Sequence, residues 1–323
     1  MSNYASTGSG ESPAISQPPS SGDMFFDKSF RGMTYAFTLA TILLLGYILF
    51  EIGGKALPAM SEFGLGFMFS TTWDVNAGQF GILPEIWGTL YSSLVALFVG
   101  GFFGITIAIF VTQDFLPHKI ETILKRIIEL LAAIPSVVYG LWGIFVLIPL
   151  IRPFAHFLND ILGWLPFFST RLSGPGMFPA AIVLSIMILP TVAAISQDAF
   201  NAIPHKTKEA AYGMGTTRWE AILRVMIPTA SGGIFGALVL GFGRALGETM
   251  ALAMLVGNSN QISLSLFAPA NTLAALLAMN FPEAGEKEVS LLMYAACVLL
   301  VITLLVNVAG AAIIARTGSG GKK

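Results

Sequence analysis

Charged residues are scarce in this sequence. Only 11% of its 323 residues are charged, whereas 55% are hydrophobic and the mean hydropathy is +0.77. A soluble domain carries roughly 25% charged residues, so this chain cannot cover itself with a wetted surface. The composition excludes a soluble globular protein and predicts an all-α protein that is integral to a lipid membrane.

Patterns for redox, metal and nucleotide chemistry are also lacking. Cys297 is the single cysteine, so no intrachain disulfide can form. His118, His156 and His205 do not have the spacing of metal ligands. No Gly-x-x-x-x-Gly-Lys-Ser/Thr phosphate loop occurs in the sequence. We therefore expect no catalytic residue, no metal and no bound cofactor: the chain is not an enzyme, and any ATP is hydrolysed by another polypeptide.

Six stretches are long and apolar enough to cross a bilayer core, which needs roughly 20 helical residues. The expected spans are Met33–Phe50, Leu90–Thr112, about Leu130–Ile151, about Phe178–Ser196, about Ser231–Val256 and about Val289–Ala315. Residues 262–281 are free of charge but contain Pro269, Asn271 and Asn280, which make a poor span. We expect Asn271–Met279 to form a short helix at or within the outer surface, and leave open whether this segment re-enters the membrane or lies on it.

The distribution of basic residues predicts the orientation of these spans. With the N-terminus in the cytoplasm, twelve of the 17 Lys and Arg residues fall inside, four fall outside, and Arg244 lies within a span. This bias predicts that both termini are cytoplasmic in a bacterial plasma (inner) membrane. Residues 1–30, rich in Ser, Gly and Pro, are expected to be a disordered cytoplasmic tail. Residues 31–85 then hold the first span and an outer loop, 86–316 form the core domain, and 317–323 form a second cytoplasmic tail.

The predicted cytoplasmic loop 197–229 carries the most informative motif. Its order is Glu-Ala-Ala, three residues, Gly, nine residues, then aliphatic-x-aliphatic-Pro, at Glu209, Ala210, Ala211, Gly215 and 225–228. Gly215 suits the turn after a helix end, and Pro228 is expected to end the next helix before the membrane. The motif is similar to the EAA motif of ABC importer permeases, in which two short helices insert into a cleft of the cytoplasmic ATPase. The alternative is an ordinary polar loop.

Two charges, Arg244 and Glu248, interrupt the fifth expected span. A charge at the bilayer centre costs roughly 2.5–3.5 kcal/mol on insertion scales, so such residues are functional candidates by default. Their spacing predicts that they lie one turn apart on one helix face and can neutralise one another. A structural ion pair that only holds helices together is the alternative.

The segment 243–251 around these charges resembles the signature of the phosphate-specific permease subunits of ABC importers, the PstC-like and PstA-like pair. Residues 134–140 and the outer segments 72–74 and 80–84 also resemble that family, and the long N-terminal region favours the PstC-like member. The resemblance implies six transmembrane helices in a type I ABC importer permease fold. It implies that Arg244 attracts the phosphate oxyanion and that Glu248 modulates it. Ser136 and Thr249 could add hydroxyl donors to the path, or could bond only their own helix backbone.

The resemblance also implies partners. These are a second, PstA-like permease subunit, a dimer of ATP-hydrolysing subunits, and a periplasmic or extracellular phosphate-binding protein; no nucleic acid is expected. Two other interpretations stay open. One is an ABC importer permease for another oxyanion or a small nutrient, and the other is a secondary transporter that works without ATP.

Overall fold

We describe a computed structural model that covers residues 21–74, 77–113 and 115–318. These residues form helices and loops without a β-strand, which confirms the all-α prediction. The chain divides into two compact units, 1–51 and 52–323. The helix α1 (Ser21–Phe63) runs through the boundary between them. Residues 21–30, expected in a disordered tail, belong to this helix, and the rest of that expected tail lies outside the described residues.

In the part of the chain that the structure describes, six helical stretches are long and apolar enough to cross a membrane, as expected. They are Met24–Phe63, Leu83–Thr112, Ser136–Leu162, Met177–Asn201, Arg218–Leu246 and Glu286–Ala315. The remaining described elements are shorter. They are α2 (Gly66–Phe69), α4 (His118–Ala133), the 3-10 turns η2 (Pro166–Phe168) and η4 (Phe281–Glu283), α8 (His205–Gly213), α11 (Met250–Leu255) and α12 (Leu273–Asn280).

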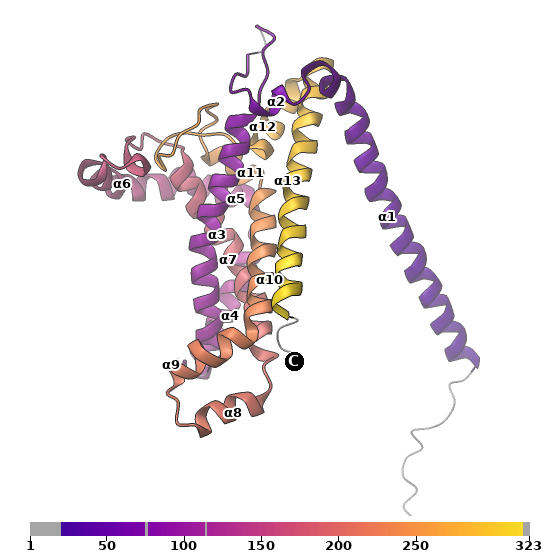
Figure 1. Cartoon of the computed structure of the whole chain (residues 1–323), viewed down its shortest axis with the longest axis vertical. Helices are drawn as coiled ribbons and strands as arrows, with labels where there is room; N and C mark the ends of the chain where they lie inside the picture. Colours follow the sequence, from indigo (N-terminus) through magenta and orange to yellow (C-terminus); the bar gives the residue numbers. More distant parts are fainter. Residues whose placement is uncertain (1–20, 75–76, 114, 319–323) are drawn as a thin grey trace, which may run out of the picture. The chain divides into compact units, whose positions relative to one another are not determined.

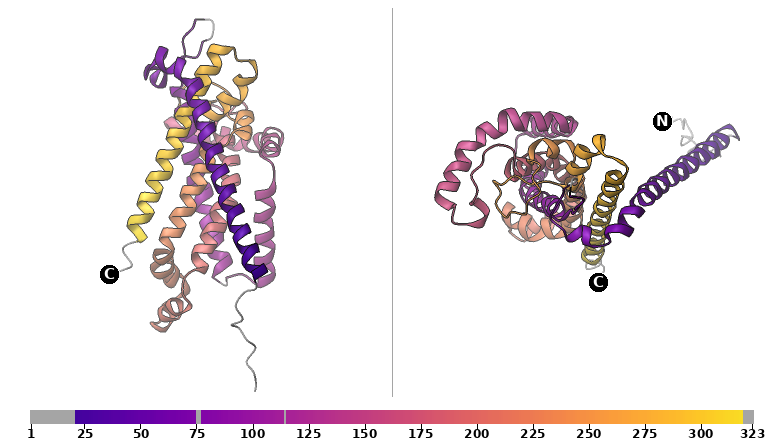
Figure 2. Two further views of the ribbon diagram at one scale, coloured as in Figure 1. Left: turned by 90° about the vertical axis from the view of Figure 1, so that its right-hand side faces the viewer. Right: turned by 90° about the horizontal axis from the view of Figure 1, so that it is seen from above.

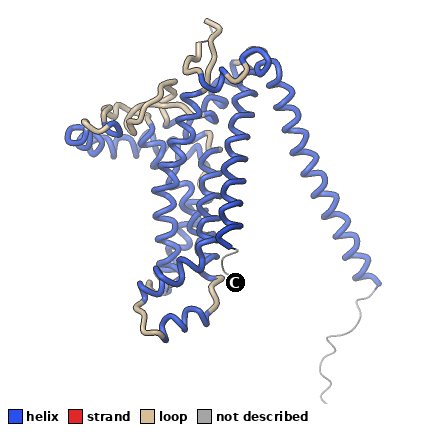
Figure 3. The backbone as a smooth tube through the Cα atoms, in the orientation of Figure 1, coloured by secondary structure: helices blue, strands red, loops and turns tan. Residues whose placement is uncertain are grey.

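The bundle of the second unit is built on α3 (Leu83–Thr112) and α7 (Met177–Asn201), which pack along each other. The helix α10 (Ile227–Leu246) packs against both, and α13 (Glu286–Gly318) packs against α10. Figure 1 shows these four helices running side by side, with α8 at one end of the bundle and α6 at the other. Figure 3 shows that the loops gather at these two ends, here called the α8 end and the α6 end.

The third expected span, Leu130–Ile151, is wrong in its boundaries. The helix α4 ends at Ala133, and the chain is extended at Ile134, because a residue before a proline is disfavoured in the helical region. After Pro135 come α5 (Ser136–Trp142), the π-helical η1 (Gly143–Leu147) and α6 (Ile148–Leu162). Figure 1 and the view from above in Figure 2 show that α6 lies across the bundle rather than along it.

The fifth expected span, Ser231–Val256, is wrong at both ends. The prediction that Pro228 ends a helix fails, because α9 (Arg218–Ala221), the π-helical η3 (Ile222–Met226) and α10 form one continuous helix. Proline removes a backbone donor and crowds the carbonyl of the preceding turn. The π-helical turn widens the helix there, and the N–H of Ile227 reaches the carbonyl oxygen of Ile222. At its other end α10 stops at Leu246, and α11 begins only at Met250.

The charge-free segment 262–281 ends in a helix, α12, close to the expected Asn271–Met279. Its first four residues, Leu273–Leu276, are buried, so α12 packs inside the α6 end of the bundle against α3, α11 and α13. Side chains of α3 hold the preceding loop in place. The Trp87 indole donates a hydrogen bond to the carbonyl of Ser263, and the Tyr91 hydroxyl donates one to the carbonyl of Leu264.

A glycine on α3 permits this close approach. A Cβ atom at Gly88 would overlap the carbonyl oxygen of Asn271. We therefore expect Gly88→Ala to lower the free energy of unfolding by about 1–3 kcal/mol, the usual cost of overpacking. Thermal unfolding of the purified protein in detergent measures this. The control is Gly232→Ala in α10, where an added Cβ meets nothing within 4 Å; equal destabilisation by both variants would contradict the contact.

Candidate functional site

Arg244 lies in the last turn of α10 and is exposed on the surface of the chain. Its guanidinium Nη1 donates a hydrogen bond to Oγ1 of Thr191 on α7, at 3.0 Å. Its charge also acts on the hydroxyl of Tyr139 on α5. A guanidinium has five N–H donors, so the bond to Thr191 fixes its position and leaves other donors for a ligand.

Glu248 is not on the same helix face as Arg244. The helix ends at Leu246, Gly247 caps it, and the N–H of Glu248 donates a weak hydrogen bond to the carbonyl of Ala245 at 3.3 Å. The expected arrangement one helical turn apart is therefore wrong. No ion pair joins Arg244 to Glu248 in the described part of the chain. The alternative in which Arg244 and Glu248 form only a structural ion pair therefore loses its main support.

The interruption between α10 and α11 opens onto a hollow of about 460 Å³. Thr249 contributes to its lining, and its hydroxyl donates to the carbonyl of Gly247 at 3.2 Å. The other walls come from α12, η4 and α13, and include Ala274, Leu277, Ala278, Phe281 and Met293. Thr249 thus bonds to backbone, as the alternative for it predicted, yet it also lies on an open surface.

Ser136 begins α5 directly after the break at Pro135 and is half-buried. Its hydroxyl makes no hydrogen bond within the described residues, so it is free to serve a ligand. The helix α5 packs closely on α11, and Gly140 permits this approach. A Cβ added at Gly140 would lie 2.6 Å from the Met254 sulfur. The structure brings Ser136, Thr249 and Arg244 to neighbouring elements, and no hydrogen bond joins their side chains within the described residues.

Thr191 and Tyr139 are the residues of this site that the sequence analysis missed. Thr191 follows Pro190 inside a mostly apolar span, and this polar residue beside a helix proline is the signal that could have found it. Tyr139 lies in the segment 134–140 but was not singled out. It is buried, and its hydroxyl donates to the carbonyl of Leu131 across the break between α4 and α5.

The helix α8 and the turn that follows it form a second candidate site, at the α8 end. Glu209 and Ala210 are exposed, whereas Ala211 is buried. Gly215 has a φ of 83°, in the left-handed region that favours glycine. The N–H of Gly215 donates to the carbonyl of Tyr212 at 2.9 Å, and the N–H of Thr216 reaches the carbonyl of Ala211 at 3.4 Å. These two bonds define a Schellman helix end.

The next helix, α9, is fixed by a capping box. The Thr217 hydroxyl accepts from the N–H of Glu220, and the Glu220 carboxylate accepts from the N–H of Thr217. Large apolar side chains around this turn remain exposed: Tyr212, Met214, Trp219 and Leu223. Exposed apolar side chains grouped in this way are typical of a surface that contacts another protein or a membrane.

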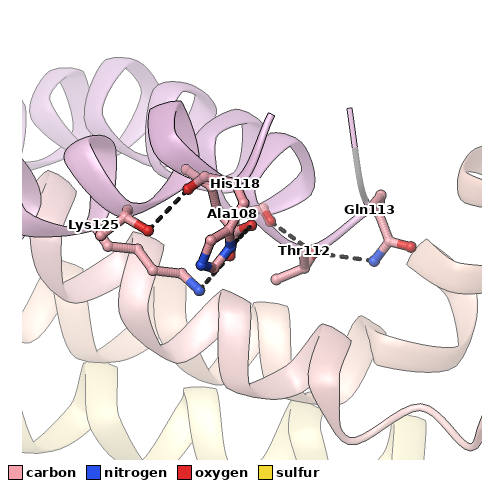
Figure 4. A network of polar contacts seen from close by, with 7 residues as sticks. Ala108, Thr112, Gln113, His118 and Lys125 are labelled. Carbon is pink, nitrogen blue, oxygen red and sulfur yellow. Dashed lines mark hydrogen bonds and ion pairs between the residues drawn. The ribbon is translucent and has the colours of Figure 1, made fainter. Parts of the chain in front are cut away.

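Figure 4 shows the polar network of the turn between α3 and α4, also at the α8 end. Gln113 Nε2 donates to Thr112 Oγ1, and Lys125 Nζ donates to Glu121 Oε1 at 2.6 Å. The bond from Lys125 lowers the pKa of the Glu121 carboxyl, which keeps the carboxylate charged. Gln113 also lines a polar hollow of about 470 Å³, together with His205, Lys208, Glu209, Tyr212, Thr216 and Arg218. No group of three His, Cys, Asp or Glu side chains suited to a metal ion occurs in the ranges that the structure covers.

The six candidate spans in the described part of the chain define a multi-pass membrane protein. Residues 100–318 match the family described as the binding-protein-dependent transport system inner membrane component, and the chain belongs to this family.

Curated relatives cover nearly the whole chain. The phosphate transport system permease protein PstC of Haemophilus influenzae is 40% identical over 287 residues, which are 87% of this chain and 91% of that protein. The protein of the same name from Mesorhizobium japonicum is 38% identical, over 87% of both chains. A probable PstC from Methanocaldococcus jannaschii is 36% identical, over 83% of this chain and 86% of that protein.

Solved structures share the fold. A bacterial alginate ABC transporter, solved with an alginate pentasaccharide-bound periplasmic protein, aligns with a TM-score of 0.61 at 17% identity, over 90% of this chain and 97% of that chain. The inward-facing MetNI methionine ABC transporter aligns with a TM-score of 0.55 at 19% identity, over 73% of this chain and 95% of that chain. These likenesses confirm the expected type I ABC importer permease fold.

Proposed function

We propose that this chain is one of two permease subunits of an ATP-driven importer of inorganic phosphate. The observation that carries the proposal is the identity of up to 40% with phosphate permease proteins, which extends over about nine-tenths of both chains. The exposed guanidinium of Arg244 beside a helix interruption supports the same substrate, because guanidinium suits the oxygens of phosphate.

In this proposal the α8 end faces the cytoplasm of a bacterial inner membrane, and both termini are cytoplasmic. The exposed apolar residues of α8 and α9 dock on one subunit of an ATPase dimer. ATP is bound and hydrolysed there, so this chain itself needs no cofactor. A PstA-like subunit supplies the other half of the path, and a phosphate-binding protein delivers the ion at the α6 end.

Arg244 would attract the ion within the membrane, where Thr191 keeps its guanidinium in place. Glu248, at the interruption after α10, would weaken this attraction enough for the ion to leave, because a conducting site must not trap its ion. Thr249 and Ser136 would add hydroxyl donors from neighbouring elements. Closing of the ATPase dimer would move α8 and α9 and so switch the path between its outward and inward openings.

Loss of the chain tests the substrate. We expect cells that lack it to lose high-affinity uptake of labelled phosphate and to keep uptake of labelled sulfate. Restoring the chain should restore phosphate uptake. Equal loss of both anions would instead favour a permease for another oxyanion.

Detergent extraction tests the class of transporter. We expect the chain to bring down an ATP-hydrolysing subunit and a second permease subunit. Transport of phosphate by the chain alone in liposomes, with no ATPase present, would contradict the proposal and favour a secondary transporter.

A further inference from the structure

The α6 end carries a basic hollow that the proposed path does not use. It has a volume of about 330 Å³, and it is lined by Arg152 and His156 of α6 and by Arg171, Leu172 and Ser173 of the following loop. Arg244 and the other predicted path residues do not belong to it. The hollow joins two arginines and a histidine from two segments of the chain.

Backbone carbonyls position two of these side chains. Arg152 Nη2 donates to the carbonyl of Ser173 at 2.9 Å, and His156 Nε2 lies 3.0 Å from the carbonyl of Leu172. The carbonyl of Ser173 orients the Arg152 guanidinium without neutralising its charge, and Arg152 keeps further N–H donors. Arg171 is exposed and forms no ion pair within the described ranges. The carboxylate nearest along α6, Asp160, is not paired with any of the three in the same ranges.

The helix α6 has two sharply different faces. Its exposed apolar residues recur at helical spacing, at Leu150, Phe154, Phe157 and Ile161. Arg152 and Asn159 lie on the opposite face, where Asn159 donates to the carbonyl of Phe168 at 2.6 Å. Trp164, 78% exposed, follows the helix end. A helix with such faces is typical of the membrane interface, and so is an exposed tryptophan.

We propose that Arg152, His156 and Arg171 form a binding site for a phosphate group, separate from the translocation path. The positive charge, the N–H donors and the absence of a paired carboxylate within the described ranges suit an anion that offers two oxygens to a guanidinium, as a phosphate group does. The interfacial position of α6 places the hollow at the depth of phospholipid headgroups. Two sources offer this chemistry there: the headgroup of an anionic lipid, and free inorganic phosphate. Either would hold α6 to the loop that carries Arg171.

The test measures stabilisation rather than transport, so that it is independent of the proposed function. The full chain is purified with the subunits that accompany it, in an Arg244→Gln background that weakens anion binding in the path. In one arm, inorganic phosphate is titrated in detergent, with chloride at equal ionic strength as the control. In the other arm, nanodiscs of phosphatidylcholine alone are compared with nanodiscs that also contain phosphatidylglycerol. Thermal unfolding is recorded in both.

We expect one arm to raise the unfolding temperature, and Arg171→Gln to weaken the apparent affinity about tenfold or more, the usual effect of losing a charged hydrogen bond. Arg171 is exposed, so this variant should fold. Lys287→Gln is the matched control, because Lys287 is engaged by Glu62 at 2.7 Å and should leave the response unchanged. A response to phosphate alone identifies the free ion, and a response to phosphatidylglycerol alone identifies the lipid. No response in either arm, or an equal response in Arg171→Gln and its parent, would overturn the site.

Discussion

Replacing Arg244 with glutamine is expected to reduce labelled-phosphate uptake roughly ten- to hundred-fold while the complex still assembles. A hydrogen bond to a charged group contributes about 1.5–3 kcal/mol, and each 1.4 kcal/mol is a factor of ten. The side chain is exposed, and within the described residues its one hydrogen bond is that to Thr191. Its removal should therefore change the path far more than the fold. Uptake in cells and co-purification of subunits measure the two effects separately.

Two matched variants separate charge from position. Arg244→Lys keeps the charge but loses the planar fork, and should retain part of the uptake. Thr191→Val removes only the acceptor that holds the guanidinium and leaves the charge in the path. A several-fold loss of uptake is therefore expected, smaller than that of Arg244→Gln. If the Arg244→Gln complex does not assemble, the role of Arg244 is structural and the proposed path is wrong.

Gly215→Val is the second change with a large expected effect. Left-handed backbone costs an L-residue roughly 1–2 kcal/mol, and a β-branched side chain is a clear outlier there. We expect the turn between α8 and α9 to shift, so that ATP hydrolysis continues but no longer drives uptake. The protein should remain in the membrane, because Gly215 is exposed and an added Cβ would meet nothing within 4 Å. ATPase activity and phosphate uptake of the same preparation measure the uncoupling.

Asparagine tolerates the left-handed region better than valine, so Gly215→Asn should keep more coupling than Gly215→Val. Gly213→Val controls for size, since Gly213 lies two residues earlier in α8 without a positive φ and with open space around it. Full coupling in Gly215→Val would rule out this turn as the coupling element.

The sequence predicted the number of stretches that are long and apolar enough to cross a membrane, because charge and apolar length are local properties. It also predicted α8 and the turn at Gly215, where each residue has a local conformational preference. Two boundaries failed at prolines, and a third failed where α10 stops at Leu246. Pro135 separates α4 from α5, whereas Pro228 lies inside a continuous helix, because a π-helical turn absorbs it. Whether a proline ends a helix depends on the packing around it, which a single sequence does not contain.

The candidate sites show the same limit. Helical spacing placed Arg244 and Glu248 on one face, but the helix ends between them at Leu246. The contact of Arg244 with Thr191 joins residues 53 positions apart, and no local pattern connects them. The basic hollow at the α6 end depends on the loop at Arg171 folding back on α6, which only the tertiary structure shows.

The continuous helix from Arg218 to Leu246 has a mechanical consequence. Its first turn belongs to the surface that the ATPase is proposed to hold, and its last turn carries Arg244. At about 1.5 Å per residue, the two are joined by a rod roughly 40 Å long. Because the π-helical turn and Pro228 lie within this helix without interrupting it, a tilt of its first turn is carried along its length to the last. The position of the guanidinium would then report the nucleotide state on the far side of the membrane, with no relay of side chains between them.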